Sequence, residues 1–146
     1  MSIAPEEDPL VQVIVVRQDL DWPAGAMAAQ CVHASVAVNA LHSDMPEVVQ
    51  YLSPANIPHM HTVVRSVKGE TQLRNLSAKL GEAGVAHHLW IEQPEDVPSA
   101  LAMVPMPRLG YSIYICIDYC MLHSAIHTLC TQCALGYGLN TCGVCT

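Results

Sequence analysis

The segment LVQVIVVR (residues 10–17) constrains the fold most, because it is a nearly unbroken run of β-branched, apolar residues. A run of this length without polar alternation is typical of a strand that is covered on both faces. A turn with two aspartates and Pro23 follows, and then an alanine-rich segment of helical composition. We therefore expect a buried strand, a turn and a helix at about 25–42, with Pro23 in or just before the first helical turn.

Strands and helices continue to alternate up to about residue 105. The further strands are predicted at 61–67, 85–91 and 100–105, with a two-proline loop at 92–99 before the last of them. Such alternation favours an α/β sandwich with a mainly parallel sheet. Ligand sites in such folds lie at the carboxyl ends of strands, here after Arg17 and after Ile91.

Two more helices are predicted between these strands. The first begins at residues 43–47, with Asp44 as the cap and Pro46 early in the first turn, and ends near residues 53–54. The second covers residues 70–84, where leucines recur at helical spacing and Gly84 is a C-terminal stop signal.

Length and charge limit the classes of protein that fit this chain. Its 146 residues suit one domain, and a net charge of -7 with six scattered Lys and Arg residues lacks the basic patch of a typical nucleic-acid binder. The acidic N-terminus, residues 1–9, has no apolar signal segment and is expected to be disordered. We therefore predict a cytoplasmic protein with reduced thiols.

A compositional boundary lies near Arg108. Residues 109–146 carry one charged residue, Asp118, and six of the seven cysteines. Two CxxC pairs, Cys130/Cys133 and Cys142/Cys145, have the spacing of zinc ligands, so a zinc-binding protein is one alternative. The weak periodicity instead favours a divergent, Cys-rich tail that does not fold with the domain, such as an alternative-splice segment. Asp118 and other polar residues interrupt its apolar stretch, and we expect no membrane span.

Two separated blocks resemble one known family. The segment VVRQDLDWPAGAMAAQCVHASV resembles the first signature of the type-II peptidyl-tRNA hydrolases, in which a strand ends in an R-x-D-L-like turn and a helix reads A-A-Q-x-x-H-A. HLWIEQPEDVPSALAMVPMPR (88–108) is similar to the second signature of a eukaryotic subfamily, the peptidyl-tRNA hydrolase domain-containing proteins. The resemblance covers roughly residues 10–108. It implies a small three-layer α/β sandwich, with a four-stranded mixed β-sheet and helices on both faces.

The chain departs from the family pattern at two places. The family enzymes carry lysines in the loop before the helix, and both positions are alanine here, Ala24 and Ala26. Where the second signature reads D-x-G-x-T, Glu92 replaces the aspartate and Asp96 replaces the threonine. A cation that could hold a phosphate or stabilise an oxyanion is therefore missing from the loop.

The resemblance implies an enzyme that cleaves the ester between a peptide and the 3′ end of tRNA, with no cofactor and no metal. His33 is the candidate general base, because an ordinary imidazole is mostly neutral at cytosolic pH. Glu92 would orient the imidazole or share the attacking water. Gln30 lies one turn before His33 on the same helix face and could donate its amide to a carbonyl or to the ribose. The structural alternatives are a hydrogen-bonded core histidine and a solvated loop acid.

Five further residues complete the predicted substrate-binding set with Gln30: Arg17, Asp19, Trp22, Gly25 and Asp96. Arg17 would meet a phosphate, or else pair with Asp19 or Asp21 for structural reasons. Trp22 would stack on a base or act as a packing anchor. Gly25 would let the backbone approach the substrate, where helix amide groups favour anions.

Three functional hypotheses follow. The first is a peptidyl-tRNA hydrolase that acts in translation, with peptidyl-tRNA as its partner. The second is a catalytically degenerate RNA- or protein-binding module on the same fold, which the missing lysines and the acidic charge favour. The third is the zinc-binding protein. The sequence leaves open whether the chain forms a homodimer, and nothing in it suggests a membrane partner.

Overall fold

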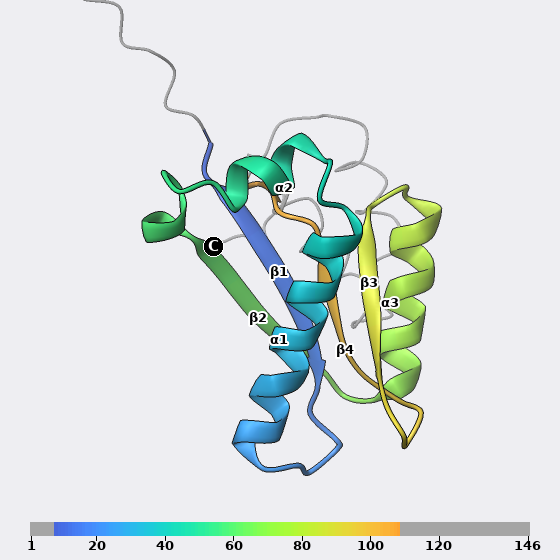
Figure 1. Cartoon of the computed structure of the whole chain (residues 1–146). Coiled ribbons are helices and arrows are strands. Elements are labelled where there is room, and N and C mark those ends of the chain that lie inside the picture. Colours follow the sequence, from blue (N-terminus) through green and yellow to red (C-terminus); the bar gives the residue numbers. More distant parts are fainter. Residues whose placement is uncertain (1–7, 109–146) are drawn as a thin grey trace, which may run out of the picture. The chain divides into compact units, whose positions relative to one another are not determined.

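The computed structural model describes residues 8–108 (Figure 1). The chain divides into two units, residues 1–106 and 107–146, and of the second unit only Pro107 and Arg108 are among the described residues. The Cys-rich tail with its CxxC pairs, and the predicted disorder of the N-terminus, therefore fall outside the described part of the chain. The elements are β1 (Leu10–Arg17), α1 (Ala24–Leu41), α2 (Pro46–Tyr51), a 3-10 turn η1 (Ile57–His59), β2 (His61–Val67), α3 (Glu70–Glu82), β3 (His87–Glu92), β4 (Val97–Met103) and β5 (Met106–Pro107).

The strands form one mixed sheet in the order β2-β1-β4-β3, and the short β5 pairs with β1. β1 and β2 are parallel, with Val11 opposite His61 and Arg17 opposite Val67. β4 is antiparallel to both β1 and β3. The expectation of a mainly parallel sheet is thus wrong, whereas the mixed sheet implied by the family resemblance is confirmed. The physical reason is the connection between β3 and β4, because residues 93–96 are too few for a crossover and form a hairpin.

Helices cover both faces of the sheet, so the sandwich has three layers (Figure 1). α1 and α2 cover one face and contribute Ala34, Val38 and Val48 to a buried cluster with Ile14 of β1 and alanines of β4. α3 lies on the other face, where it buries Leu73, Leu76 and Leu80 at helical spacing.

The local predictions are confirmed for most elements. β1 and β2 have the predicted bounds, and α1 follows Pro23 as its N-cap residue. Gly84 adopts a φ of 70°, which glycine reaches without strain, and the chain leaves α3 there. The predicted cap of α2 is wrong, because Met45 and not Asp44 is its N-cap residue.

β4 begins three residues earlier than predicted. Val97 and Pro98 pair with Glu92 and Ile91, and the register shifts so that Ser99 is an extra residue between Pro98 and Ala100. This β-bulge tolerates Pro98, whose missing N–H would disturb a regular ladder. The prolines that suggested a loop at 92–99 therefore mark a hairpin and a bulged strand.

α1 is the one helix among residues 8–108 that is long and apolar enough to cross a membrane by length and composition alone. The core helix of a soluble protein meets the same criterion, and α1 packs against β1, β3 and β4, with Ala34 and Val38 fully buried. The expectation that no membrane is involved stays a prediction.

Candidate active site

The candidate residues gather at one edge of the sheet. β1 and β3 are both antiparallel to β4, so they run in the same direction and their carboxyl ends share this edge with the start of β4. The turn after β1 leads directly into the N-terminus of α1 at the same edge (Figure 1). The segments that follow Arg17 and Ile91 therefore lie at the same edge of the sheet.

Gln30 is held beneath the surface by the bulge of β4. The Ser99 hydroxyl donates a hydrogen bond of 2.6 Å to the Gln30 side-chain oxygen, Oε1. Ser99 is fully buried and Gln30 is 4% exposed. This bond occupies the amide oxygen and so fixes which end of the amide is the NH₂ group. Among the hydrogen bonds of residues 8–108, none uses that NH₂ group, and a buried donor of this kind favours a ligand that supplies an acceptor.

His33 lies one helical turn after Gln30 and is exposed. Its ring stacks on the indole of Trp90, with ring centroids 4.9 Å apart and an interplanar angle of 27°. The indole Nε1–H of Trp90 donates a hydrogen bond of 2.8 Å to Oε2 of Glu92. The structure thus places His33 and Glu92, the two predicted catalytic residues, in contact with the side chain of Trp90. Among the described residues, His33 and Glu92 have no hydrogen bond to each other.

Trp90, like Ser99, is a site residue that the sequence reasoning missed. It stands two residues before Glu92 on β3, so both side chains share one face of the strand. A half-buried tryptophan needs a partner for its N–H, and a carboxylate two residues away can supply one. This spacing is the signal that could have identified Trp90 from the sequence.

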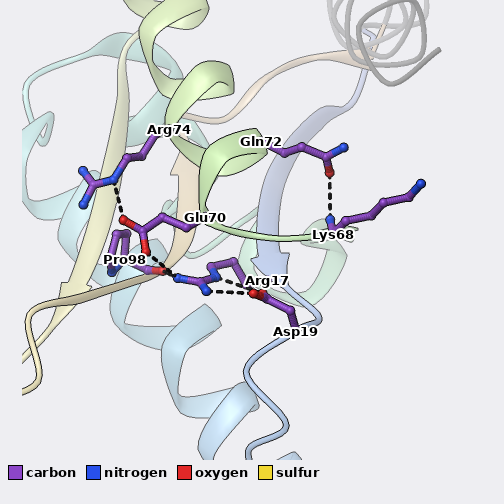
Figure 2. A network of polar contacts seen from close by, with 7 residues as sticks. All are labelled: Arg17, Asp19, Lys68, Glu70, Gln72, Arg74 and Pro98. Atoms are coloured by element: carbon purple, nitrogen blue, oxygen red, sulfur yellow. Dashed lines mark hydrogen bonds and ion pairs between the residues drawn. The ribbon is translucent and has the colours of Figure 1, made fainter. Parts of the chain in front are cut away.

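Arg17 lies at the same edge of the sheet and is only 8% exposed (Figure 2). Its Nε and Nη2 donate to the two oxygens of Asp19 at 2.9 and 2.8 Å. Its Nη1 donates to Glu70 at 3.1 Å and to the buried carbonyl of Pro98 at 3.0 Å. Each guanidinium nitrogen therefore has a partner within the protein, as the structural alternative proposed, and its predicted phosphate contact stays a prediction.

The charges of this network are mutually stabilised. The hydrogen bonds to Asp19 are the main cause that raises the pKa of Arg17, and the same bonds lower the pKa of the Asp19 carboxyl. The pKa of Glu70 is lowered mainly by its hydrogen bond from Arg74, with a smaller contribution from Arg17. The network ties together the end of β1, the first turn of α3 and the start of β4 (Figure 2).

The remaining predicted residues are peripheral. Trp22 is half-buried in the turn before α1, and Gly25 is exposed in the first turn of the helix. A side chain at Gly25 would meet nothing within 4 Å, so the described chain has no close approach that requires glycine there. Asp96 has a φ of 56° in the hairpin turn and accepts a long bond of 3.4 Å from Gln93. Among the described residues, none of these three forms a hydrogen bond, an ion pair or a ring stacking with His33.

Within residues 8–108 no group of three or more His, Cys, Asp or Glu side chains could hold a metal ion. Cys31 is half-buried, and burial raises the pKa of its thiol, which disfavours the reactive thiolate. Near the carboxyl ends of β1 and β3, His33 supplies an imidazole, Glu92 a carboxylate and Gln30 an amide donor.

Comparison with known proteins identifies the family of the chain. The family described as peptidyl-tRNA hydrolase PTH2 matches residues 10–110. The chain belongs to the PTH2 family of peptidyl-tRNA hydrolases, which confirms the resemblance seen in the sequence.

Two relatives carry the name "Putative peptidyl-tRNA hydrolase PTRHD1". The protein from Mus musculus is 38% identical over 111 residues, which cover 73% of this chain and 78% of the relative. The protein from Homo sapiens is 38% identical over 115 residues, which cover 75% of this chain and 81% of the relative. Both similarities span most of the relatives' own length.

Proposed function

We propose that this protein hydrolyses the ester bond between a peptide and the 3′ end of tRNA, with His33 as the general base and Glu92 as its supporting carboxylate. The observation that carries the proposal is the arrangement of His33, Trp90 and Glu92 beside the buried Gln30 amide, in a member of the PTH2 family. These groups cover the three needs of ester hydrolysis, which are water activation, carbonyl orientation and oxyanion stabilisation.

The steps follow from the chemistry of these side chains. The neutral imidazole of His33 takes a proton from water as the water oxygen attacks the carbonyl carbon of the ester. The Gln30 amide donates a hydrogen bond to the oxygen that becomes negative in the tetrahedral intermediate. The bond from carbon to the ribose 3′-oxygen then breaks, and the imidazolium returns its proton to that oxygen. The products are a peptide with a free carboxyl group and tRNA with a free 3′ hydroxyl.

A second candidate is a binding module on the same fold. Ala24 and Ala26 occupy the positions of the family's loop lysines, and the first turn of α1 carries no charged side chain. The formal net charge of -7 also opposes binding to an extended phosphate backbone. The same edge would then bind an RNA 3′ end or a protein without turnover.

Peptide release from an N-blocked aminoacyl-tRNA, catalysed by the purified full-length chain, separates the two candidates. We expect turnover by the wild type and a loss of roughly 10²–10⁴-fold in kcat for His33→Ala. His59→Ala is the matched control, because His59 is also exposed but lies in η1, before β2 and at the opposite edge of the sheet. A folded wild-type protein without turnover would rule out the hydrolase, and a complex with tRNA in a gel-shift assay would then favour the binding module.

A further inference from the structure

Trp90 has contacts with both proposed catalytic residues, through two different parts of one indole. The face of the indole contacts the imidazole of His33 at a centroid distance of 4.9 Å. Its edge, the Nε1–H group, reaches Glu92 at 2.8 Å. We propose that Trp90 is a positioning residue that holds the His33 imidazole and the Glu92 carboxylate in the geometry needed for ester hydrolysis. This inference rests on the proposed function, because it assigns the residue that prepares the same site.

Trp90 is itself held firmly. It is half-buried and packs against the buried cluster that includes Ile14 and Ala34. Ala34 is the residue next to His33 on α1, and α1 packs against β3, so the helix that carries His33 lies beside the strand that carries Trp90. The imidazole is exposed and would otherwise be free to change rotamer. Stacking on an anchored indole therefore restricts the ring without burying it.

A β-bulge of β4 lies opposite the strand segment that carries Trp90 and Glu92. Trp90 pairs with Ala100 and Ile91 pairs with Pro98, so the bulge at Ser99 lies opposite the step between Trp90 and Ile91. A bulge bends and twists the strands locally, and bulges commonly re-aim side chains beside active sites. Ser99 also holds Gln30 through its hydroxyl. One irregularity of the sheet thus lies beside both polar pairs of the site, Trp90–Glu92 and Ser99–Gln30.

The arrangement has a direct chemical consequence. When His33 takes the proton from water, the imidazolium lies against the negative π face of the indole, which favours a cation. Oε2 of Glu92 accepts a hydrogen bond from the indole N–H, and Oε1 can accept a bond from the water or from the imidazolium. Trp90 contacts neither the ester nor the water in this scheme, and it acts through its two neighbours.

Two variants separate the two contacts. Trp90→Phe retains an aromatic ring that can stack on His33 but removes the N–H donor, whereas Trp90→Leu removes both. We expect Trp90→Phe to lower kcat about tenfold with KM nearly unchanged, and Trp90→Leu to lower kcat further, because misplaced catalytic groups reduce transition-state stabilisation. Tyr51→Phe is the matched control. It also removes one donor from an aromatic ring, but Tyr51 bonds to His61 and Thr62 at the opposite edge of the sheet.

A double-mutant comparison tests whether Trp90 acts through Glu92. In a Glu92→Ala background the additional change Trp90→Phe should lower kcat by less than twofold, because the hydrogen bond is already absent. A full tenfold loss in that background would contradict the proposal, as would a wild-type kcat in the single variant Trp90→Phe. A general loss of folding would cause this same loss in both backgrounds, so an equal loss counts against the positioning role.

A nuclear magnetic resonance measurement tests the contacts without turnover. The chain has two tryptophans, so the Nε1–H resonance that disappears in Trp90→Phe belongs to Trp90. We expect Glu92→Ala to move this resonance upfield, and Trp90→Leu to move the ring protons of His33 downfield as the indole ring current is lost. An unmoved indole resonance in Glu92→Ala would overturn the positioning role. If NMR shows both the stacking on His33 and the bond to Glu92 but the folded wild type has no turnover, the proposed function fails and the positioning role fails with it. If the wild type turns over and Trp90→Phe leaves that rate unchanged, only the role of Trp90 is overturned.

Discussion

Replacing Arg17 with lysine tests the network that joins three elements at the site edge. Lysine retains the charge, but its ammonium group cannot form the bidentate pair that the guanidinium makes with Asp19 at 2.9 and 2.8 Å. It also cannot reach Glu70 and the Pro98 carbonyl with the same fork geometry. We therefore expect Arg17→Lys to destabilise the fold while the net charge stays constant.

The magnitude follows from the exposure of each partner. The Asp19 side chain is 39% exposed, so water can replace most of the hydrogen bonds that its carboxylate loses. The contact between Arg17 and Asp19 therefore contributes less than about 1 kcal/mol to the free energy of unfolding. The Pro98 carbonyl is buried, and leaving it without a donor costs about 1–3 kcal/mol. Together these losses predict a decrease of about 2 kcal/mol in the free energy of unfolding.

Urea unfolding followed by circular dichroism measures this change. With a slope of about 1–1.5 kcal/mol per M for a small domain, the midpoint should fall by roughly 1.5 M while the slope stays constant. Arg65→Lys is the matched control, because Arg65 is exposed on β2, and its midpoint should change by less than about 0.5 M. Equal midpoints for wild type and Arg17→Lys would refute the reasoning.

The same pair of proteins gives a test of pH dependence. The Arg17 hydrogen bonds lower the pKa of Asp19 below its usual 3.8, so the folded state favours the carboxylate. This contribution is fully present above the unfolded pKa and is lost as the pH falls through the lower pKa of the folded state. The difference in stability between wild type and Arg17→Lys should therefore be smaller at pH 2.5 than at pH 7, as measured by urea unfolding at both values.

Three further predictions concern residues away from this network. Ser99→Ala should lower the free energy of unfolding by about 1–2 kcal/mol in urea titrations, because the variant leaves the buried side-chain oxygen of Gln30 without its donor. An unchanged value would mean that a water replaces the hydroxyl. Leu73→Ala should lower the free energy of unfolding by about 2–5 kcal/mol by the same method, since Leu73 of α3 is fully buried against the sheet. A decrease below about 1 kcal/mol would contradict the packing of that face. The pKa of His88 is lowered mainly by burial, with smaller contributions from His87 and His42. Its ring protons should therefore titrate at a lower pH than those of an ordinary histidine in NMR spectra, and the wild type should lose stability as the pH falls below about 6.5. A normal titration of His88 would refute this.

The sequence predicted the elements better than it predicted their directions. An apolar run and a helical repeat record which faces of a segment are covered, and these patterns located β1, α1, β2 and α3. They do not record which strand lies beside which, and so the mainly parallel sheet was wrong. The prolines at 94 and 98 indicated a loop, whereas pairing with β3 extended β4 to Val97.

The candidate site was predicted in part for the same reason. The spacing of Gln30 and His33 on one helix is local, and the structure retains it at the predicted edge of the sheet. The partners that hold these side chains, Ser99 and Trp90, lie about 60 residues further along the chain and contact them only after β3 and β4 have paired. Sequence spacing carries no information about such contacts.

The sequence alone determined the class of fold, the family to which the chain belongs and the helix that carries Gln30 and His33. Only the tertiary structure decided that Glu70 and the Pro98 carbonyl accept hydrogen bonds from Arg17, and that His33 stacks on Trp90. The physical reason is that the repeat of a helix or strand fixes which residues share one face of that element. Hydrogen bonds and ring stacking between elements depend on how the elements pack, and a single bulge in β4 changes which side chains meet.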